Sequence, residues 1–182
     1  MIDGSVLIGS DRFVLMLERL CLELIENYGD FENACIIGIQ PRGVILTDRM
    51  MQVFDHLKAK RPEWYGKLDI TFYRDDFRTR DKPLSASSTE MDFLIEGKKV
   101  ILVDDVLYTG RTINAALNAL LNFGRPEKVE LLVLVDRRFN RELPISSDYI
   151  GTTIDALSQE YVKVEWKEIH GEDRILFFSG KT

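Results

Sequence analysis

Short apolar runs alternate with amphipathic helical patterns through the first 135 residues, and this alternation constrains the fold more than any other feature. The apolar runs cover residues 34–39, 99–103 and 129–135. The helical patterns cover residues 11–28, 43–60 and 112–123. Apart from Lys99 and Glu130, these runs of strand length are apolar, which suits strands that are buried on both faces. Strand and helix in this order predict an α/β fold with a central, mostly parallel, twisted sheet flanked by helices and joined by right-handed crossovers.

The remaining segments predict further strands and one unusual loop. Residues 68–73 alternate between apolar and polar side chains, as a strand does. Residues 161–169 and 174–178, separated by a polar turn, predict a C-terminal β-hairpin. Residues 74–93 are polar and charged, and a stretch of this length between two strands indicates either a disordered loop or a functional lid. The sequence contains no internal repeat and no linker, so we expect a single domain over residues 1–182.

The composition excludes some classes of protein. The net charge of −6 argues against a simple basic nucleic-acid-binding protein, although it leaves a local basic patch open. Cys21 and Cys35 lie in apolar patterns and are expected to be buried thiols in a reducing compartment. Residues 1–10 lack the layout of a signal peptide, and the apolar runs are too short to cross a bilayer, so we expect a cytoplasmic protein that does not enter a membrane.

The polar loops that follow the buried strands are the expected place for a ligand. These loops are residues 40–43, 104–112 and 136–141. In an open parallel sheet, ligands bind beyond the carboxyl ends of the strands, so the three loops should converge on one site. The polar loop of residues 74–93 should lie over it.

The segment from Val100 to Thr112 contains the most specific pattern in the chain. A buried strand leads into Asp104 and Asp105, then into a small-residue turn and the start of a helix. Backbone N–H groups at a helix start bind anions, and Thr109 and Thr112 can add hydroxyl donors. The segment lacks the glycine and lysine spacing of a P-loop and is no dinucleotide fingerprint. The alternative is an ordinary strand–turn–helix with two acids before the helix.

These thirteen residues closely resemble the motif that binds 5-phosphoribosyl-1-pyrophosphate (PRPP) in the type I phosphoribosyltransferases. Within that group the chain resembles the PyrR family over almost its whole length, from about residue 5 to residue 178. Other matching segments are Asp69–Asp76, Val133–Arg137, Arg141–Ile145, Asp148–Gly151 and Gly171–Arg174. The resemblance implies the type I phosphoribosyltransferase fold with a flexible catalytic loop over about residues 74–93.

The resemblance also implies roles for individual residues. Asp104 and Asp105 would hold the 2′- and 3′-hydroxyls of ribose, and Tyr108–Thr112 would wrap the 5′-phosphate. Arg42 would contact the pyrophosphate, and Gly43 would let the backbone come close. The PRPP-binding set is Pro41, Arg42, Gly43, Asp104, Asp105, Val106, Leu107, Tyr108, Thr109, Gly110, Arg111 and Thr112.

The chain departs from the PyrR pattern at three places. Pro41 stands where the pattern has Thr, and an X–Pro bond adopts the cis form far more readily than other peptide bonds. Residues 138–140 replace a Gly-His pair and are one residue longer, and Thr152 stands where a Lys is expected. These changes leave the contacts to the base and to any RNA open.

The lid and the base site follow from the same resemblance. The lid residues are Arg74, Asp75, Asp76, Arg78 and Arg80, and the base-binding residues are Val135, Asp136 and Arg137. The catalytic residues would be the two acids Asp104 and Asp105, which favour positive charge on the ribose ring, and Arg42 and Arg74, which stabilise the leaving pyrophosphate. No residue stands out as a general base.

The implied reaction is PRPP plus uracil giving UMP and pyrophosphate, and the PyrR resemblance leaves open that the same protein also regulates pyrimidine gene expression by binding mRNA. Mg²⁺ would accompany PRPP and be held mainly by PRPP and water rather than by protein side chains. A homodimer or larger homo-oligomer is expected from the family. Two alternatives stay open: an mRNA-binding pyrimidine attenuation regulator with only vestigial catalysis, and a purine phosphoribosyltransferase, since type I enzymes share the PRPP motif and differ in the base loop.

Overall fold

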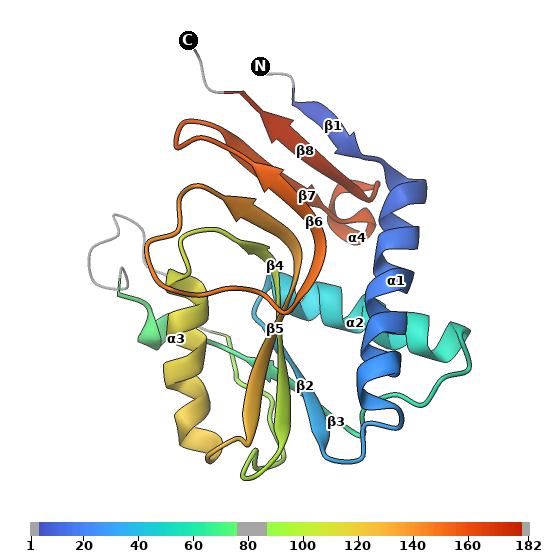
Figure 1. Ribbon diagram of the computed structural model, residues 1–182, viewed down its shortest axis with the longest axis vertical. Helices are drawn as coiled ribbons and strands as arrows, with labels where there is room; N and C mark the ends of the chain where they lie inside the picture. Colours follow the sequence, from blue (N-terminus) through green and yellow to red (C-terminus); the bar gives the residue numbers. More distant parts are fainter. Residues whose placement is uncertain (1–3, 76–86, 180–182) are drawn as a thin grey trace.

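A computed structural model describes residues 4–75 and 87–179 of the chain. Its centre is a five-stranded sheet in the order β3-β2-β4-β5-β6, in which every neighbouring pair is parallel (Figure 1). The strands are β2 (Ala34–Ile39), β3 (Trp64–Leu68), β4 (Lys99–Leu107), β5 (Lys128–Arg138) and β6 (Tyr149–Asp155). The predicted parallel sheet is therefore confirmed.

Helices cover both faces of this sheet. Helices α1 (Ser10–Tyr28) and α2 (Arg42–His56) pack on one face, and α3 (Arg111–Leu120) packs on the other (Figure 1). Alternate side chains of β4 point to the two faces of the sheet. Ile101 belongs to the core under α1 and α2, and Leu102 belongs to the core under α3. Both are fully buried, which explains why the residues between Lys99 and the acidic pair are all apolar.

A second, smaller sheet lies beyond the carboxyl ends of the large sheet's strands (Figure 1). It is antiparallel in the order β1-β8-β7, with β1 (Ser5–Ile8), β7 (Tyr161–Glu165) and β8 (Arg174–Phe178). The predicted C-terminal hairpin is confirmed as β7 and β8, joined through the short helix α4 (Lys167–His170). The third strand comes from the N-terminus and was not predicted.

Some predicted boundaries are wrong. Residues 68–73 are not a strand: β3 ends at Leu68, and Thr71–Tyr73 form the 3₁₀ turn η1. The cause is local, because Asp69 Oδ1 accepts hydrogen bonds from the backbone N–H (3.1 Å) and the hydroxyl (2.6 Å) of Thr71. Such an aspartate turn bends the chain away from the sheet although the side chains alternate.

Other elements differ in length from the prediction. The helix expected over residues 43–60 ends at His56, and the one over 112–123 begins at Arg111 and becomes the 3₁₀ turn η2 (Leu121–Phe123) after Leu120. Cys21 and Cys35 are free and buried, as predicted. Within the described part of the chain, no helix is both long and apolar enough to cross a membrane.

Candidate active site

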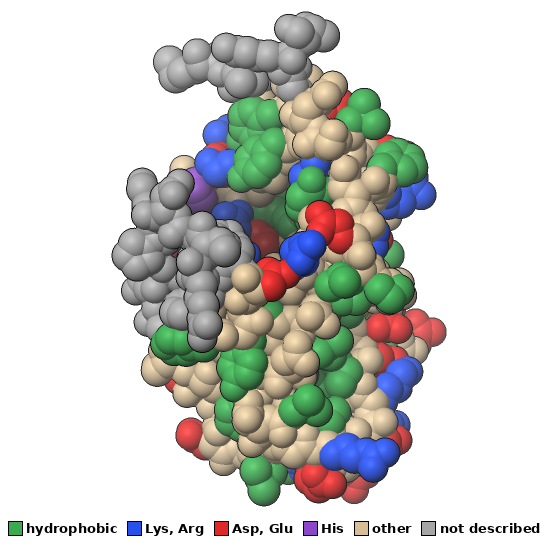
Figure 2. Space-filling model, turned by 90° about the vertical axis from the view of Figure 1, so that its left-hand side faces the viewer, with side chains coloured by type: hydrophobic (Ala, Val, Ile, Leu, Met, Phe, Trp, Pro, Cys, Tyr) green, Lys and Arg blue, Asp and Glu red, His purple; other side chains and the backbone are tan. Residues whose placement is uncertain are grey.

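The three predicted loops do converge where the strands of the large sheet end. Arg42, at the start of α2, donates from Nε to Asp105 Oδ2 on β4. Arg141, in the loop after β5, donates to the carbonyl of Tyr108 in the loop after β4. Figure 2 shows a hollow with basic and acidic side chains at this level, below the small sheet. The site is therefore built from the ends of β2, β4 and β5.

The acidic pair lies inside β4 rather than in the loop that follows it. Asp104 pairs with Val133 of β5, and the strand continues through Leu107. Asp104 and Asp105 are only 7% and 6% exposed. Asp104 Oδ1 accepts a hydrogen bond from the N–H of Asp105 at 2.9 Å. Both acids are thus buried, and the pairing of β4 fixes the position of their backbone.

Burial controls the electrostatics of this pair. It raises the pKa of Asp104 well above the ordinary value, and the neighbouring charge of Asp105 raises it further, while Arg42 and Arg74 oppose the shift. Burial also raises the pKa of Asp105, against the attraction of Arg42. Arg42 is held in place by a second hydrogen bond, from Nη2 to the carbonyl of Val164 on β7.

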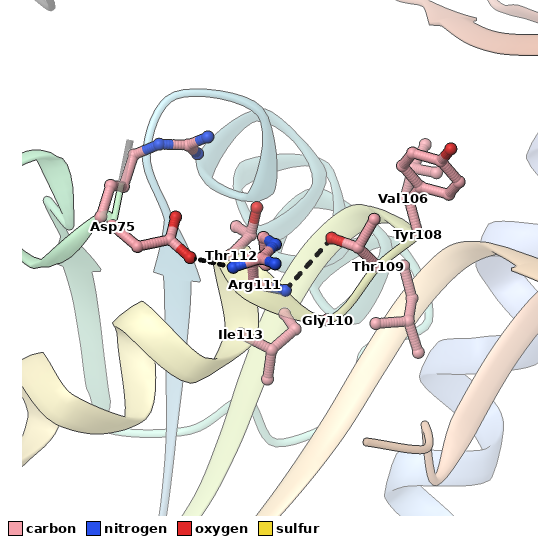
Figure 3. Close-up of a pocket in the computed structure, with 10 residues that line it drawn as sticks. Asp75, Val106, Tyr108, Thr109, Gly110, Arg111, Thr112 and Ile113 are labelled. Atoms are coloured by element: carbon pink, nitrogen blue, oxygen red, sulfur yellow. Dashed lines mark hydrogen bonds and ion pairs between the residues drawn. The ribbon is translucent and has the colours of Figure 1, made fainter. Parts of the chain in front are cut away.

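The loop from Tyr108 to Thr112 forms the floor of a pocket of about 550 Å³, lined by Arg74, Asp75 and residues 106–113 (Figure 3). Gly110 adopts φ +92°, a left-handed conformation that glycine accommodates without strain, and it turns the chain into α3. Thr109 Oγ1 accepts from the N–H of Arg111 at 3.4 Å. A helix start open to a pocket in this way is an anion-binding arrangement.

The loop before α2 presses closely against β4. The Gln40–Pro41 peptide bond is cis, and Pro41 occupies the position before the first residue of α2. A Cβ on Gly43 would lie 2.2 Å from the carbonyl oxygen of Val103. Glycine is therefore required at position 43 for the loop to come this near to the acidic pair.

The three residues predicted to bind the base lie near the end of β5, and we call this part of the site the base side. Val135 is fully buried in the core, and Asp136 forms an ion pair with Arg141 at 2.5 Å. Arg137 donates from Nη2 to the carbonyls of Leu157 (2.9 Å) and Glu160 (2.7 Å). Its guanidinium carbon lies 3.8 Å from the centre of the Tyr108 ring, within the range of a cation–π contact.

Comparison with known proteins agrees with this geometry. Residues 10–169 match the family described as the phosphoribosyl transferase domain. The "Bifunctional protein PyrR" of Microcystis aeruginosa is 44% identical over 169 residues, covering 93% of this chain and 94% of that protein. The protein of the same name from Bacillus cereus is 38% identical over 178 residues, covering 97% and 98%. This chain belongs to the PyrR family of phosphoribosyltransferases.

Solved structures confirm the fold at much lower identity. A hypoxanthine phosphoribosyltransferase from Staphylococcus aureus superimposes with a TM-score of 0.70 at 18% identity, over 96% of this chain and 92% of that one. The enzyme of the same name from Trypanosoma cruzi gives 0.69 at 15% identity, over 97% of each chain. The expected type I phosphoribosyltransferase fold is therefore shown. At such low identity, the base named for these two enzymes is not assigned to this chain.

Part of the predicted lid lies in the described structure. Asp75 pairs with Arg111 at the start of α3, and Arg74 lines the same pocket. Asp76, Arg78 and Arg80 lie outside the described residues. Across residues 4–75 and 87–179, no group of three or more His, Cys, Asp or Glu side chains is placed to hold a metal ion.

Sequence reasoning assigned no role to two residues that the structure brings to the site. Arg141 contacts both Tyr108 and Asp136, and Glu142 accepts a hydrogen bond from Arg111 Nε at 2.6 Å. Both belong to the segment Arg141–Ile145, which matched the PyrR pattern without a function attached to it. That match was the signal available in the sequence, but only the fold reveals what these side chains touch.

Proposed function

We propose that this PyrR family member transfers the 5-phosphoribosyl group of PRPP to uracil, giving UMP and pyrophosphate. One observation carries the proposal: three different recognition elements meet at the end of β4. A buried carboxyl pair suits ribose hydroxyls, an open helix start suits a phosphate, and Arg42 suits pyrophosphate. PRPP has these three parts in one molecule, so the site matches the substrate as a whole.

The chemistry follows from where each group lies. The bond from C1′ of ribose to the pyrophosphate oxygen breaks, and its electron pair leaves with the oxygen. N1 of uracil forms the new bond to C1′ and loses its proton. Positive charge that develops on the ribose ring is favoured by Asp104 and Asp105, and negative charge on the leaving pyrophosphate by Arg42 and Arg74. The protein contributes mainly by orienting the reactants and excluding water.

Mg²⁺ would bind PRPP and neutralise part of its charge. Asp104 and Asp105 would offer at most two carboxyl groups to such an ion, which is too few for a complete magnesium site. Such a donor set fits a metal ion held mainly by PRPP oxygens and water. Asp104 and Asp105 would hold the ribose hydroxyls.

Substitution Arg42→Ala should separate the pyrophosphate contact from the rest of the site. We expect the affinity for PRPP with Mg²⁺ to fall by roughly a hundredfold, since a charge-assisted contact is lost, while the affinity for UMP changes by about threefold or less. Titration calorimetry with each ligand measures both values. Equal losses for PRPP and UMP would mean that Arg42 does not meet pyrophosphate.

Regulation through mRNA is the second function that we propose, since the relatives from Microcystis and Bacillus are named bifunctional. Phosphate contacts make RNA binding salt-dependent, so the logarithm of the affinity should fall linearly with the logarithm of salt concentration. Filter binding of a pyrimidine-operon leader RNA with and without UMP checks this. Affinity that is absent at low salt would leave the enzyme activity as the function of this chain.

A further inference from the structure

Two carbonyl groups of the phosphate loop (residues 108–112), those of Tyr108 and Thr109, are hydrogen-bonded to one other segment of the chain. A loop that turns its N–H groups toward an anion must find donors elsewhere for its carbonyls. The carbonyl of Thr109 accepts from the N–H groups of Glu142 (3.0 Å) and Leu143 (3.2 Å), and the carbonyl of Tyr108 accepts from Arg141 Nη1. All three donors come from consecutive residues after β5.

Side chains of the same segment complete this support, and we call residues 141–145 the brace. A Cβ on Gly110 would meet Ile145 at 3.3 Å and Leu143 at 3.4 Å, so the brace packs directly against the turn of the phosphate loop. Glu142 binds Arg111 Nε at 2.6 Å. The brace therefore touches each of the four residues from Tyr108 to Arg111.

Arg141 is the one residue of the brace that reaches the base side as well. Its Nη2 lies 2.5 Å from Asp136 Oδ1, and the two side chains are 24% and 14% exposed. Arg137, the neighbour of Asp136 on β5, stacks on the ring of Tyr108. Tyr108 is thus held at its carbonyl by one arginine and at its ring by another, and both arginines come from the end of β5 and its loop.

We propose that Arg141 is a positioning residue, which holds the phosphate loop in its anion-binding form and ties that loop to Asp136 on the base side. The planar guanidinium presents parallel donors and can satisfy a carbonyl and a carboxylate at once, whereas a lysine ammonium on one stem cannot match this fork. This proposal rests on the proposed function at one point: the anion in the phosphate loop is the 5′-phosphate of PRPP or UMP.

The test compares two ligands that occupy different loops. In Arg141→Gln, we expect the Kd of UMP to rise about tenfold or more, since a charge-assisted contact behind the phosphate loop is lost. Magnesium pyrophosphate is expected to bind at the loop that contains Arg42, so its Kd should change by about twofold or less. Arg42→Ala should give the reverse pattern. Titration calorimetry measures these values without turnover, so a defect in catalysis does not obscure them.

A matched control is Arg138→Gln. Arg138 at the end of β5 pairs with Asp155 at the end of β6, and both side chains are about half exposed. Exposed pairs contribute little, so both ligands should bind within about twofold of wild type. Arg141→Lys keeps the charge and stem, so it allows the comparison even if the Gln variant fails to fold, and we expect an intermediate Kd for UMP.

Unchanged UMP affinity in both Arg141 variants would overturn the positioning role, as would equal weakening of UMP and pyrophosphate, which indicates general damage to the site. Wild-type protein that binds magnesium pyrophosphate but not UMP would contradict the proposed function instead. A selective loss of UMP affinity in Arg141→Gln that is partly restored in Arg141→Lys would support Arg141 as the link between the phosphate loop and Asp136.

Discussion

The double substitution Asp104→Asn and Asp105→Asn should abolish UMP formation, lowering kcat by roughly a thousandfold or more. Both carboxyl groups lie where the positive charge of the ribose ring would develop, and an amide supplies no compensating negative charge. A coupled assay for pyrophosphate measures the loss. Asp155→Asn removes an exposed carboxylate paired with Arg138 and serves as the control, with kcat close to wild type. Activity near the wild-type level in the double variant would contradict the assignment of the acidic pair.

The same double variant should be at least as stable as wild type at neutral pH, although both residues are buried. Burial raises the pKa of Asp104 and Asp105 above the ordinary value of 3.8. The folded protein then holds protons that the unfolded chain has released, so stability falls as the pH rises from near 3.8 toward the raised values. Asparagine carries no charge and removes this dependence.

We therefore expect a gain on the order of 1 kcal/mol in the free energy of unfolding at neutral pH, as is common when a functional group that opposes folding is replaced. Urea unfolding at neutral pH and at about pH 5 measures it, and the gap between variant and wild type should narrow at the lower pH. A double variant that is much less stable than wild type at neutral pH would mean that Arg42 fully compensates the buried charges.

Substitution Gly43→Ala should be the most damaging single-methyl change in the site. The added Cβ would lie 2.2 Å from the carbonyl oxygen of Val103 and 3.1 Å from its carbon. Both are backbone atoms of the central strand, so no side chain can rotate away, and α2 must move off β4. We expect a loss of about 3 kcal/mol in the free energy of unfolding, or a displaced Arg42 loop that no longer binds PRPP.

Gly9→Ala is the matched control for this substitution. Gly9 has φ −89°, and a Cβ there would meet no atom within 4 Å. We expect its free energy of unfolding to change by less than about 1 kcal/mol and PRPP to bind normally. Urea unfolding and calorimetry with PRPP check both variants. A Gly43→Ala protein with wild-type stability and PRPP affinity would show that the close approach to β4 is not needed.

Periodicity alone predicted a parallel sheet and three of its five strands. The runs that became β2, β4 and β5 are apolar on both faces because helices cover both sides, and that pattern is strong. Strand β6 was missed because Tyr149 is its only fully buried residue and its centre is the polar run of Thr152 and Thr153. Such a strand is specified by its pairing with β5 rather than by its own composition.

The candidate site was also predicted only in part, where a local motif was present. Asp104 and Asp105 were found from a local motif, but their place inside β4 depends on pairing with Val133 and its neighbours, which no local pattern contains. Arg141 lies in a predicted site loop, but its role was not predicted, because its contact with Tyr108 spans 33 residues and is made to a backbone carbonyl. Any residue type can present a carbonyl, so the sequence carries no mark of that partner.

Release of pyrophosphate from PRPP with Mg²⁺, measured with uracil, hypoxanthine, guanine, adenine or no base, tests the central claim most directly. We expect release with uracil alone, accompanied by an equal amount of UMP. Release with a purine instead would contradict the choice of uracil while leaving the PRPP chemistry in place. Absence of release with every base, despite measurable binding of PRPP, would contradict the enzyme itself and favour the regulatory function.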